Sequence, residues 1–572
     1  MKRPFWLAVV FAFPAMLPSR AIAQATPENP LAEANARATK PASAEEEKCL
    51  REMSDYTHES VMVAMRDGVR LCTEVFLPKG QGDGPWPVVL QRTPYTRWDI
   101  KNRLGAVRGA TVAVVTQNER GRFGSEGAGT FPIETFDNEI NDSYDTVEWA
   151  AKQKWCNGKV GMIGVSGHGI AGFNAIWSGA PHLTAVNVSI TSDNAYYLFY
   201  NNGVRRFLYD WIKQRGGKSP AWPRPTIGKY DPKARQAFIA ERGAKCQAAF
   251  ANDSGWYDIF SEALLDGFVA LAPTNKVFIT IGPEGHGQIG GELKYPKTPM
   301  PEGLKVRTFK QWLTEDAPKE PTTESTLVYY LMGDTRDANA PGNVWKVTGK
   351  WPVPNKATSF YLHKDGTLAE TPPKDKDGVL SYDYDPKDPV KSHGGNWEFK
   401  ANDGPHDQRP LKDRKDMLRF VTEPLKEPVG ITGKVWVELH VSSDAPDTTF
   451  VATLVDIYPD GYAALVRIGA MMARYWQGLD RSARLERGKV YKLEMDLWST
   501  ALVFNKGHRI ALLVTSSSSP AFEVHPNTFD PVDSIDKAVV ARNTIHLSAD
   551  HASRVILPVI PKEDLVGKSE RK

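Results

Sequence analysis

The strongest candidate for a reactive side chain is Ser166, which directly follows the apolar run VGMIGV at residues 160–165. Small residues surround it, at Gly164, Gly167 and Gly169. This pattern predicts a buried strand that turns sharply into a helix, because glycines let backbone segments pass where side chains would collide. A serine on such a turn exposes its hydroxyl above the sheet and leaves the next backbone N–H free to face an oxyanion. An ordinary β-to-α turn would share the pattern, so the hypothesis needs partner residues.

Two residues far downstream could complete a nucleophilic centre. A serine hydroxyl is a weak nucleophile at neutral pH, and it needs an imidazole to take its proton and a carboxylate to orient that imidazole. Asp258 ends the segment GWYD, and His286 lies between glycines shortly after the apolar strand KVFITIG. The chain order Ser, Asp, His is that of α/β hydrolases. Asp253, Asp266 and Glu284 compete with Asp258 for the carboxylate role.

An oxyanion also needs hydrogen-bond donors. The backbone N–H of Gly167 is one, and the phenol of Tyr95, at the end of an early strand, is the candidate for the second. A tyrosine in that position would otherwise serve in packing. Further along, Arg120 directly precedes the loop GRFGSEG, and Arg122 lies within it. We interpret both as loop-fixing or surface residues, because the loop has no phosphate-binding spacing.

The segments around these residues predict a parallel sheet with crossover helices. Residues 58–78 alternate apolar and polar side chains on both sides of a turn at Asp67-Gly68, which indicates a β-hairpin. Residues 138–153 have apolar positions at helical spacing and lead into the Ser166 strand. Strand and helix alternating at this rhythm favour an α/β-hydrolase core. The aromatic-rich stretch 193–250 is expected to form an inserted helical cap.

Beyond about residue 322 the helical periodicity stops and segments such as STLVYYLMG, KVWVELHVSS and HRIALLVTSS alternate with period two. That pattern predicts an all-β jelly-roll sandwich after a linker at 315–325. The expected division of the chain is a signal peptide 1–23, a flexible leader 24–48, an α/β-hydrolase core in two parts, 49–192 and 251–320, a helical cap 193–250, and a C-terminal jelly-roll β-sandwich 322–572.

The composition of the 572 residues narrows the choice of partners. The formal net charge of +3 is close to balanced for this length, so no nucleic acid and no membrane is expected as a partner. No cysteine pair has metal-ligand spacing, so we expect no metal and no cofactor. The expected partner is a small-molecule ester or amide substrate, and the oligomeric state is left open.

The first residues have the pattern of an export signal. Lys2 and Arg3 precede an apolar run at 5–17, and small residues end at Ala23, after which we expect cleavage. The mature protein is then expected to be periplasmic or secreted, where disulfides persist. Three pairings of the four cysteines are open, of which Cys49 with Cys72 is favoured by proximity: Cys49, Cys72, Cys156 and Cys246.

Several motifs occur in the order found in one family of enzymes. They are RTPYTR, TQNERGRFGSEG, YDTVEWAAKQKWCNGKVGMIGVSG, GWYD, GPEGH, SSDAPDTTFVATLVDIYPDG and SSSSPAFEVHPNT. With them the chain, from about residue 60 to 530, resembles the cocaine esterase and X-Pro dipeptidyl-peptidase family of serine hydrolases, and also alpha-amino acid ester hydrolases and glutaryl acylases. The resemblance implies Ser166 as nucleophile, Asp258 and His286 as triad partners, and Tyr95 with the Gly167 N–H as oxyanion hole.

The sequence departs from this family directly after the nucleophile. The family usually has Tyr there, whereas this chain reads Ser166-Gly167-His168-Gly169. The backbone donor survives, but a bulky wall of the pocket is lost. His168 is expected to point into helix packing or to line the pocket. Together with Trp256 of GWYD, it is a candidate substrate-binding residue.

Three functions follow from these patterns. The first is an exported serine hydrolase that cleaves carboxylic esters through an acyl-enzyme. The second is an acylase or dipeptidyl-peptidase with the same triad, which for a peptidase requires an acid that holds the α-ammonium of the substrate. The only nearby acids in the cap stretch are Asp193 and Asp210, which favours an aromatic or uncharged acyl group. The third is a non-catalytic binding protein on a hydrolase scaffold.

Overall fold

The computed structural model describes residues 43–128, 137–192, 195–214, 237–238, 241–302, 304, 307–316, 325–398, 402–532 and 534–565. The predicted signal peptide 1–23, the leader up to residue 42, Asp193, most of the predicted linker and the middle of the predicted cap lie outside these residues. They stay predictions.

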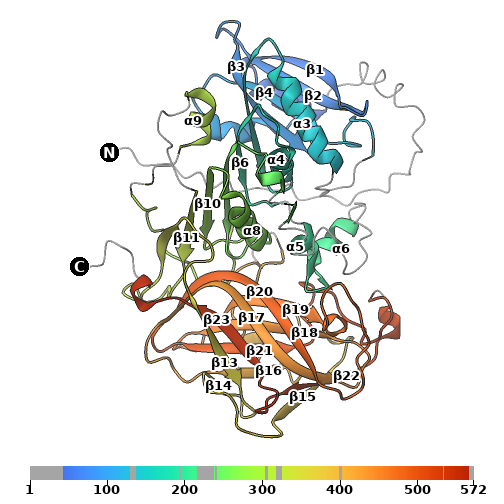
Figure 1. Cartoon of the computed structure of the whole chain (residues 1–572), viewed down its shortest axis with the longest axis vertical. Helices are drawn as coiled ribbons and strands as arrows, with labels where there is room; N and C mark the ends of the chain where they lie inside the picture. The colour runs from blue at the N-terminus through green and yellow to red at the C-terminus, as the bar shows by residue number, and fades with distance from the viewer. Residues whose placement is uncertain are drawn as a thin grey trace. The chain divides into compact units, whose positions relative to one another are not determined.

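A mixed sheet organises the first half of the chain (Figure 1). Its order, among the strands that the structure describes, is β1-β2-β4-β3-β5-β6-β9-β10-β11-β12, with parallel pairing from β4 through β11 and antiparallel pairing at both edges. The bounds are β1 (Tyr56–Ala64), β2 (Arg70–Pro78), β3 (Trp86–Thr93), β4 (Ala113–Asn118), β5 (Cys156–Val165), β6 (Leu183–Ser189), β9 (Ala249–Gly255), β10 (Val277–Gly282), β11 (Thr326–Leu331) and β12 (Val344–Thr348).

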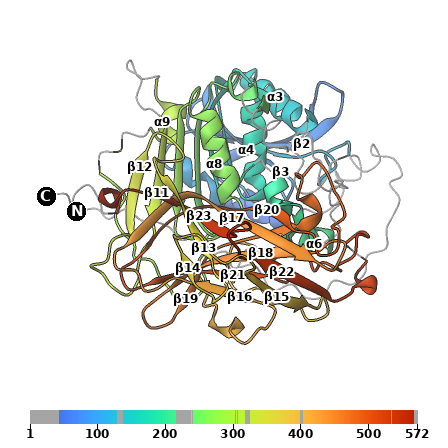
Figure 2. The same ribbon diagram turned by 60° about the horizontal axis from the view of Figure 1, so that its bottom comes forward.

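Helices cover both faces of this sheet, which is why its central strands are buried almost throughout. One face packs Val88, Leu90 and Met162 against α3, α4 and α8, and the other packs Val89 and Ile163 against α2, η1 and α9. Figure 2 shows α3, α4 and α8 over the sheet. The bounds are α2 (Ala44–Glu52), η1 (Lys101–Val107), α3 (Asp137–Ala151), α4 (Gly167–Ser178), α8 (Ser261–Leu271) and α9 (Phe309–Thr314).

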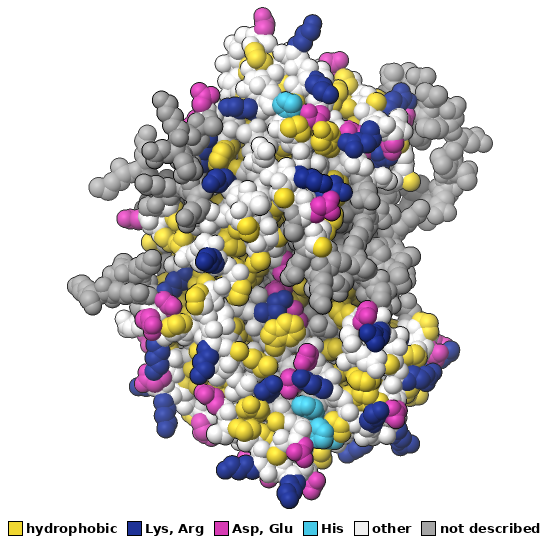
Figure 3. Space-filling view, in the orientation of Figure 1, with side chains coloured by type: hydrophobic (Ala, Val, Ile, Leu, Met, Phe, Trp, Pro, Cys, Tyr) yellow, Lys and Arg dark blue, Asp and Glu magenta, His cyan; other side chains and the backbone are white. Residues whose placement is uncertain are grey.

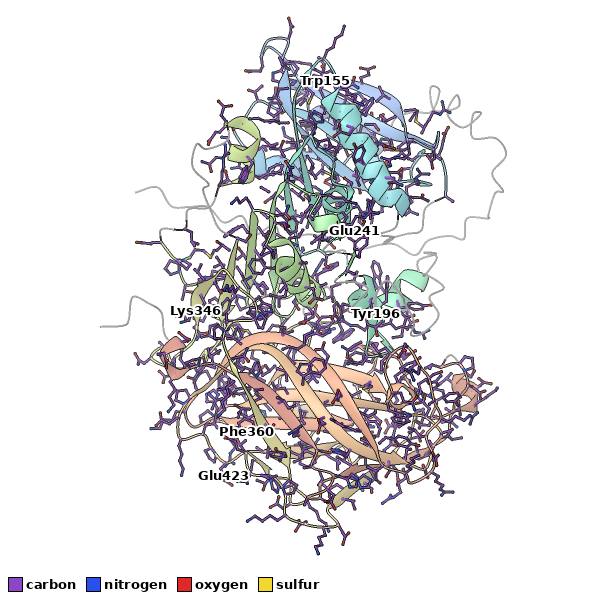
Figure 4. The ribbon with its side chains drawn as sticks, in the orientation of Figure 1. Trp155, Tyr196, Glu241, Lys346, Phe360 and Glu423 are labelled. Atoms are coloured by element: carbon purple, nitrogen blue, oxygen red, sulfur yellow. The ribbon has the colours of Figure 1, made fainter. Side chains whose placement is uncertain are left out.

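The described part of the predicted cap contains α5 (Ala195–Phe199), a small hairpin of β7 (Tyr200–Asn201) and β8 (Val204–Arg205), and α6 (Phe207–Gln214). Its aromatic side chains form their own cluster with Ile170, Ile259 and Phe260 of the core. Figure 4 labels Tyr196, whose ring stacks on Tyr200 of the hairpin at 5.7 Å between centroids.

The second half of the chain forms the C-terminal β domain, in which two antiparallel sheets enclose an apolar core. One sheet has the order β14-β13-β23-β17-β22-β15 with β20 beside β17, and the other β16-β21-β18-β19, as far as the chain is described. The bounds are β13 (Lys356–Leu362), β14 (Leu368–Ala369), β15 (Val379–Tyr384), η3 (Arg409–Leu411), β16 (Leu418–Val421), β17 (Val429–Ser443), β18 (Thr449–Ile457), β19 (Ala463–Met472), η4 (Ala473–Tyr475), β20 (Tyr491–Phe504), β21 (Arg509–Thr515), η5 (Ile535–Lys537), β22 (Ala541–His546), β23 (Arg554–Val559) and η6 (Lys562–Asp564).

The predicted fold class, an α/β-hydrolase core followed by a β-sandwich, is confirmed. The hairpin at 58–78 is β1 and β2, with Gly68 at a φ of 86° in the turn. Two details differ from prediction. STLVYYLMG, expected to open the sandwich, is β11, which pairs in parallel with β10 of the first sheet. Residues 44–48, expected in a flexible leader, form the start of α2, where the Ser43 side chain caps the helix by accepting from the Glu46 N–H.

The Cys49–Cys72 disulfide, the pairing favoured from the sequence, is wrong, since none of the four cysteines, all in the described part of the chain, forms a disulfide. Cys49 packs on the inner side of α2 in an apolar cluster, and this burial raises the pKa of its thiol to about 11. A thiol kept protonated in this way is a poor partner for disulfide formation, which proceeds through the thiolate.

The face shown in Figure 3 carries Lys, Arg, Asp and Glu side chains in mixture rather than in fields of one sign. This distribution agrees with the nearly balanced net charge. In the described part of the chain, no helix combines the length and the apolar character that crossing a bilayer requires.

Candidate active site

Ser166 lies on a strained turn between β5 and α4. Its backbone has φ 54° and ψ −127°, a region that residues with a side chain rarely adopt. Two contacts to the end of β6 hold it there: the Ser166 N–H donates to the Ser189 carbonyl at 2.9 Å, and the Thr191 hydroxyl donates to the Ser166 carbonyl at 2.8 Å. The turn therefore fixes the serine at the carboxyl end of the sheet.

The small residues around Ser166 are needed by the close approach of backbone segments. A Cβ at Gly164 would stand 2.7 Å from the Cα of Gly169, and one at Gly169 would stand 2.8 Å from the Cβ of Thr191. Both distances are shorter than real Cβ contacts. The sequence interpretation of these glycines as requirements of the turn agrees with this packing.

Three predicted residues meet in one hydrogen-bonded row. His286 Nε2 lies 3.0 Å from Ser166 Oγ, and His286 Nδ1 lies 3.0 Å from Asp258 Oδ1. The carboxylate of Asp258 is fully buried, and its second oxygen accepts from the Ser254 hydroxyl at 2.7 Å. The arrangement can move a proton from the serine to the imidazole while the carboxylate orients the ring.

The turns that carry Asp258 and His286 are bonded directly to each other. The N–H of Trp256 donates to the Gly282 carbonyl, and the N–H of Tyr257 donates to the Glu284 carbonyl, both at 2.9 Å. Because β9 and β10 are parallel neighbours, their carboxyl ends deliver the two turns side by side. Asp258 and His286 are 28 residues apart in the chain, and the pairing of β9 with β10 brings them together.

Of the competing carboxylates, Asp253 and Glu284 have other surroundings. Asp253 accepts from the Ser189 hydroxyl at 2.6 Å, and burial raises its pKa. Burial likewise raises the pKa of Glu284. Asp258, by contrast, lies within hydrogen-bonding distance of His286.

Tyr95 lies against Gly167. A Cβ at Gly167 would stand 2.8 Å from Cε2 and 2.9 Å from Cζ of the Tyr95 ring, and it would be closer still to the Tyr95 hydroxyl oxygen. Burial and the charge of Glu119 raise the pKa of the Tyr95 phenol to about 12, against the lowering effect of Arg122 and Arg103. The phenol therefore stays protonated, as a hydrogen-bond donor must.

Sequence reasoning missed the residues that fix the backbone around Tyr95. The Asn118 side chain donates to the Tyr95 carbonyl, and Arg122 Nε donates to the Pro94 carbonyl at 3.1 Å. Arg122 is thus a loop-fixing residue, one of the two interpretations given from the sequence, and Arg120 is the same through its ion pairs with Asp142 and Asp67. Ser254 was also missed, although it precedes Asp258 by only four residues and has a hydroxyl that can reach back.

The two candidate substrate-binding residues have different surroundings. Trp256 is fully buried, and its indole N–H donates to the Tyr330 carbonyl at 2.7 Å, so it packs the core instead of lining an accessible surface. His168 is buried as well, and its Nε2 lies 2.9 Å from Arg103 Nη2. In the part of the chain described, no cluster of His, Cys, Asp and Glu side chains suits a metal ion.

The C-terminal β domain contacts the segments that carry Asp258 and His286. From β19, the buried guanidinium of Arg467 donates to the Trp256 carbonyl, and the Leu465 carbonyl accepts from the Tyr257 hydroxyl at 3.1 Å. In the loop before η3, the Asp403 carbonyl accepts from the Gly290 N–H at 2.7 Å. The domain thus buttresses the segments next to Asp258 and His286.

A serine on a sharp turn at the carboxyl end of a parallel sheet, with a carboxylate and an imidazole from the turns after β9 and β10, is the arrangement of the α/β-hydrolase class. Two family models match the chain: "X-Pro dipeptidyl-peptidase (S15 family)" over residues 67–227 and "X-Pro dipeptidyl-peptidase C-terminal non-catalytic domain" over residues 319–556. The chain is 31% identical to a cocaine esterase of Rhodococcus sp. (strain MB1 Bresler), over 88% of this chain and 98% of that one. It belongs to the cocaine esterase and X-Pro dipeptidyl-peptidase family and is a serine hydrolase.

Solved structures show the same fold. An alpha-amino acid ester hydrolase matches with a TM-score of 0.71 at 24% identity, over 91% of this chain and 98% of that one. An aminopeptidase from the marine sediment archaeon Thaumarchaeota archaeon matches with a TM-score of 0.71 at 22% identity, over 89% and 97%. The predicted family, fold and enzyme class are therefore confirmed.

Proposed function

We propose that the protein cleaves carboxylic esters of small molecules through an acyl-enzyme on Ser166, with His286 as the general base and Asp258 as the group that orients it. The observation that carries the proposal is the row from Asp258 through His286 to Ser166, with both hydrogen bonds at 3.0 Å. The ester-cleaving relative supports the type of bond.

The proposed reaction has two halves. The Ser166 oxygen forms a bond to the ester carbonyl carbon as His286 Nε2 takes the hydroxyl proton, and the Tyr95 phenol and the Gly167 N–H donate to the oxygen that becomes negative. The carbon–oxygen bond to the alcohol then breaks, and His286 returns the proton to the leaving alcohol. Water, deprotonated by His286, releases the acid and restores Ser166.

The test uses a fluorophosphonate probe and a p-nitrophenyl ester. Ser166→Ala is expected to abolish both labelling and turnover, whereas Ser359→Ala, on β13 of the C-terminal β domain, leaves both unchanged. A well-folded protein that takes no label, or that keeps its turnover without Ser166, contradicts the proposal and favours a binding protein. Turnover of an X-Pro anilide faster than of the aryl ester favours the amide-cleaving alternative.

We also propose that the protein is exported, to the periplasm or beyond the cell. Lys2 and Arg3 before the apolar run at 5–17, with small residues up to Ala23, support this proposal. When the full chain is expressed in a bacterium, the expected mature protein begins at Gln24. N-terminal sequencing that finds an uncleaved Met1 in the cytoplasmic fraction contradicts it.

A further inference from the structure

A partly buried row of polar side chains lies beside the proposed oxyanion site and has no part in the reaction described above. Arg103, on η1, places Nη2 2.8 Å from Asp99 Oδ2 and 2.9 Å from His168 Nε2. Its Nε also donates to the Asp99 carbonyl at 3.1 Å. Asp99 therefore binds the guanidinium through both its carboxylate and its backbone carbonyl. The same guanidinium contacts His168, the second residue of α4.

The protonation of His168 follows from this partner. An arginine can only donate, so Nε2 of His168 must accept and carries no proton. The imidazole is then neutral, with its proton on Nδ1. Burial and the neighbouring charge of Arg103 lower the pKa of His168 well below its usual value, in agreement with that state. His168 is thus fixed in one tautomer and one orientation, and it is no candidate for a general base.

The same imidazole also packs against the proposed oxyanion tyrosine, Tyr95. The rings of His168 and Tyr95 lie 4.8 Å apart between centroids, at 53°. The Tyr95 ring also lies against Gly167, where a Cβ would stand 2.8 Å from ring atom Cε2. The phenol thus contacts both the backbone of residue 167 and the ring of residue 168.

We propose that His168, held by Arg103, is a positioning residue that fixes the Tyr95 phenol in the oxyanion site, and that the glycine at 167 supplies the space which the phenol occupies. Position 167 is where the family usually has tyrosine, and such a side chain would collide with Tyr95 as it lies here. Gly167 and His168 then act together on the same phenol. The inference rests on the proposed function, because it concerns the donor that the proposed reaction uses.

A double-mutant cycle tests whether His168 acts through the phenol. The four proteins are wild type, His168→Ala, Tyr95→Phe and the double variant, measured as kcat and KM on a p-nitrophenyl ester. Misplacing a donor by a fraction of an ångström costs about tenfold or more in rate, so His168→Ala is expected to lower kcat about tenfold with KM within about twofold. In the Tyr95→Phe background the same change is expected to alter kcat by less than about twofold.

A second pair of variants separates the ring from the hydrogen bond. Arg103→Gln removes the cation that orients the imidazole and is expected to lower kcat in the same direction, again only when the Tyr95 hydroxyl is present. It takes the place of His168→Ala if that variant does not fold. The matched control is His182→Ala, which is expected to leave kcat unchanged. His182 pairs with Glu148 and directly precedes β6, so it lies at the amino end of that strand, whereas Ser166 follows the carboxyl end of β5.

The outcomes distinguish this inference from the proposed function. If the wild type turns over the ester and depends on Ser166, but the effects of His168→Ala and Tyr95→Phe multiply, the positioning role is wrong and the proposed function stands. A full-rate His168→Ala protein overturns the positioning role in the same way. If the folded wild type neither turns over the ester nor takes the fluorophosphonate label, the proposed function itself fails.

Discussion

Single residues at the candidate site are each held by more than one contact. The Asp258 carboxylate accepts from Ser254 with one oxygen and lies beside His286 with the other. The backbone of Tyr95 is bonded on both sides, since its N–H donates to the Thr93 hydroxyl at 3.0 Å and its carbonyl accepts from Asn118. Groups held in this way need little reorganisation when charge develops, which is how such sites accelerate acyl transfer.

Removing the Tyr95 hydroxyl is expected to slow the reaction. Tyr95→Phe loses one oxyanion donor, and the loss of one such donor typically costs about a hundredfold or more in kcat. Steady-state kinetics on a p-nitrophenyl ester measure the effect, with Tyr361→Phe on β13 as the control that keeps full activity. Full activity of Tyr95→Phe would show that another group donates to the oxyanion.

Adding a methyl group at Gly167 is expected to displace the same phenol. The Cβ of Gly167→Ala would collide with the Tyr95 ring, so we expect kcat to fall about tenfold or more. Gly105→Ala is the matched control, because a Cβ at Gly105 meets no atom within 4 Å and its φ is not positive. Equal activity of the two variants contradicts the placement of Tyr95.

At the scale of elements, the carboxyl ends of β5, β9 and β10 bring Ser166, Asp258 and His286 together, and β19 of the other domain supports the turn that carries Asp258. Arg467 of β19 is buried and donates to the carbonyls of Trp256 and Ser499. The first of these carbonyls lies two residues before Asp258. A domain described as non-catalytic in the family thus touches the turn that carries the proposed acid.

Cutting this support is expected to affect both stability and rate. Arg467→Met leaves two buried carbonyls without their donor, which costs about 1–3 kcal/mol for each unsatisfied group. We also expect kcat to fall about tenfold, measured well below the unfolding temperature, because the Asp258 turn loses an anchor. Arg509→Met on β21, which is partly exposed, is the control. A destabilised variant with unchanged kcat contradicts a positioning role for β19.

At the scale of the whole molecule, the two domains are joined by backbone pairing and by a buried charge cluster. Met332, just after β11, exchanges backbone hydrogen bonds with Ala501 and Val503 of β20 at 3.0 and 2.9 Å. Nearby, His508 lies between Asp334, which follows β11, and Asp456 of β18, with ring nitrogens 3.2 and 2.9 Å from the carboxylates. The domains therefore share an interior and are expected to unfold together.

The charge cluster predicts how stability depends on pH. Burial disfavours the imidazolium of His508, but its hydrogen bonds to Asp334 and Asp456 outweigh burial and raise the pKa to about 9. Since this value lies above that of the unfolded chain, the cluster stabilises the folded state fully below about pH 6.5, and the contribution is lost as the pH rises through about 9. The wild type is therefore expected to lose thermal stability between pH 7 and pH 10.

His508→Gln isolates this contribution. The variant is expected to melt below the wild type at pH 7, and to lose less of its melting temperature between pH 7 and pH 10. Differential scanning calorimetry of both proteins over that range measures the difference, in which the other titrating groups cancel. Parallel curves for the two proteins would mean that His508 is not charged in the folded state.

The amino-acid sequence determined the parts that depend on local pattern. The glycine-framed Ser166, the glycine-flanked His286, the β1–β2 hairpin and the period-two strands after β12 follow from backbone sterics and side-chain alternation within a few residues. The chain order of Ser, Asp and His is that of α/β hydrolases, and it predicts that each of these residues follows the carboxyl end of a sheet strand. The choice of Asp258 among several acids was made from the same order and agrees with the contact to His286.

Only the tertiary structure decided which distant segments touch. It paired β11 with β10, left Cys49 and Cys72 as thiols, buried Trp256, and set Arg103 against His168 across 65 residues of chain. None of these contacts has a local signal, because burial and hydrogen-bond satisfaction are properties of the packed interior and not of neighbours in sequence. The same reason explains why Arg467, far from Asp258 in the chain, was found only as its neighbour in space.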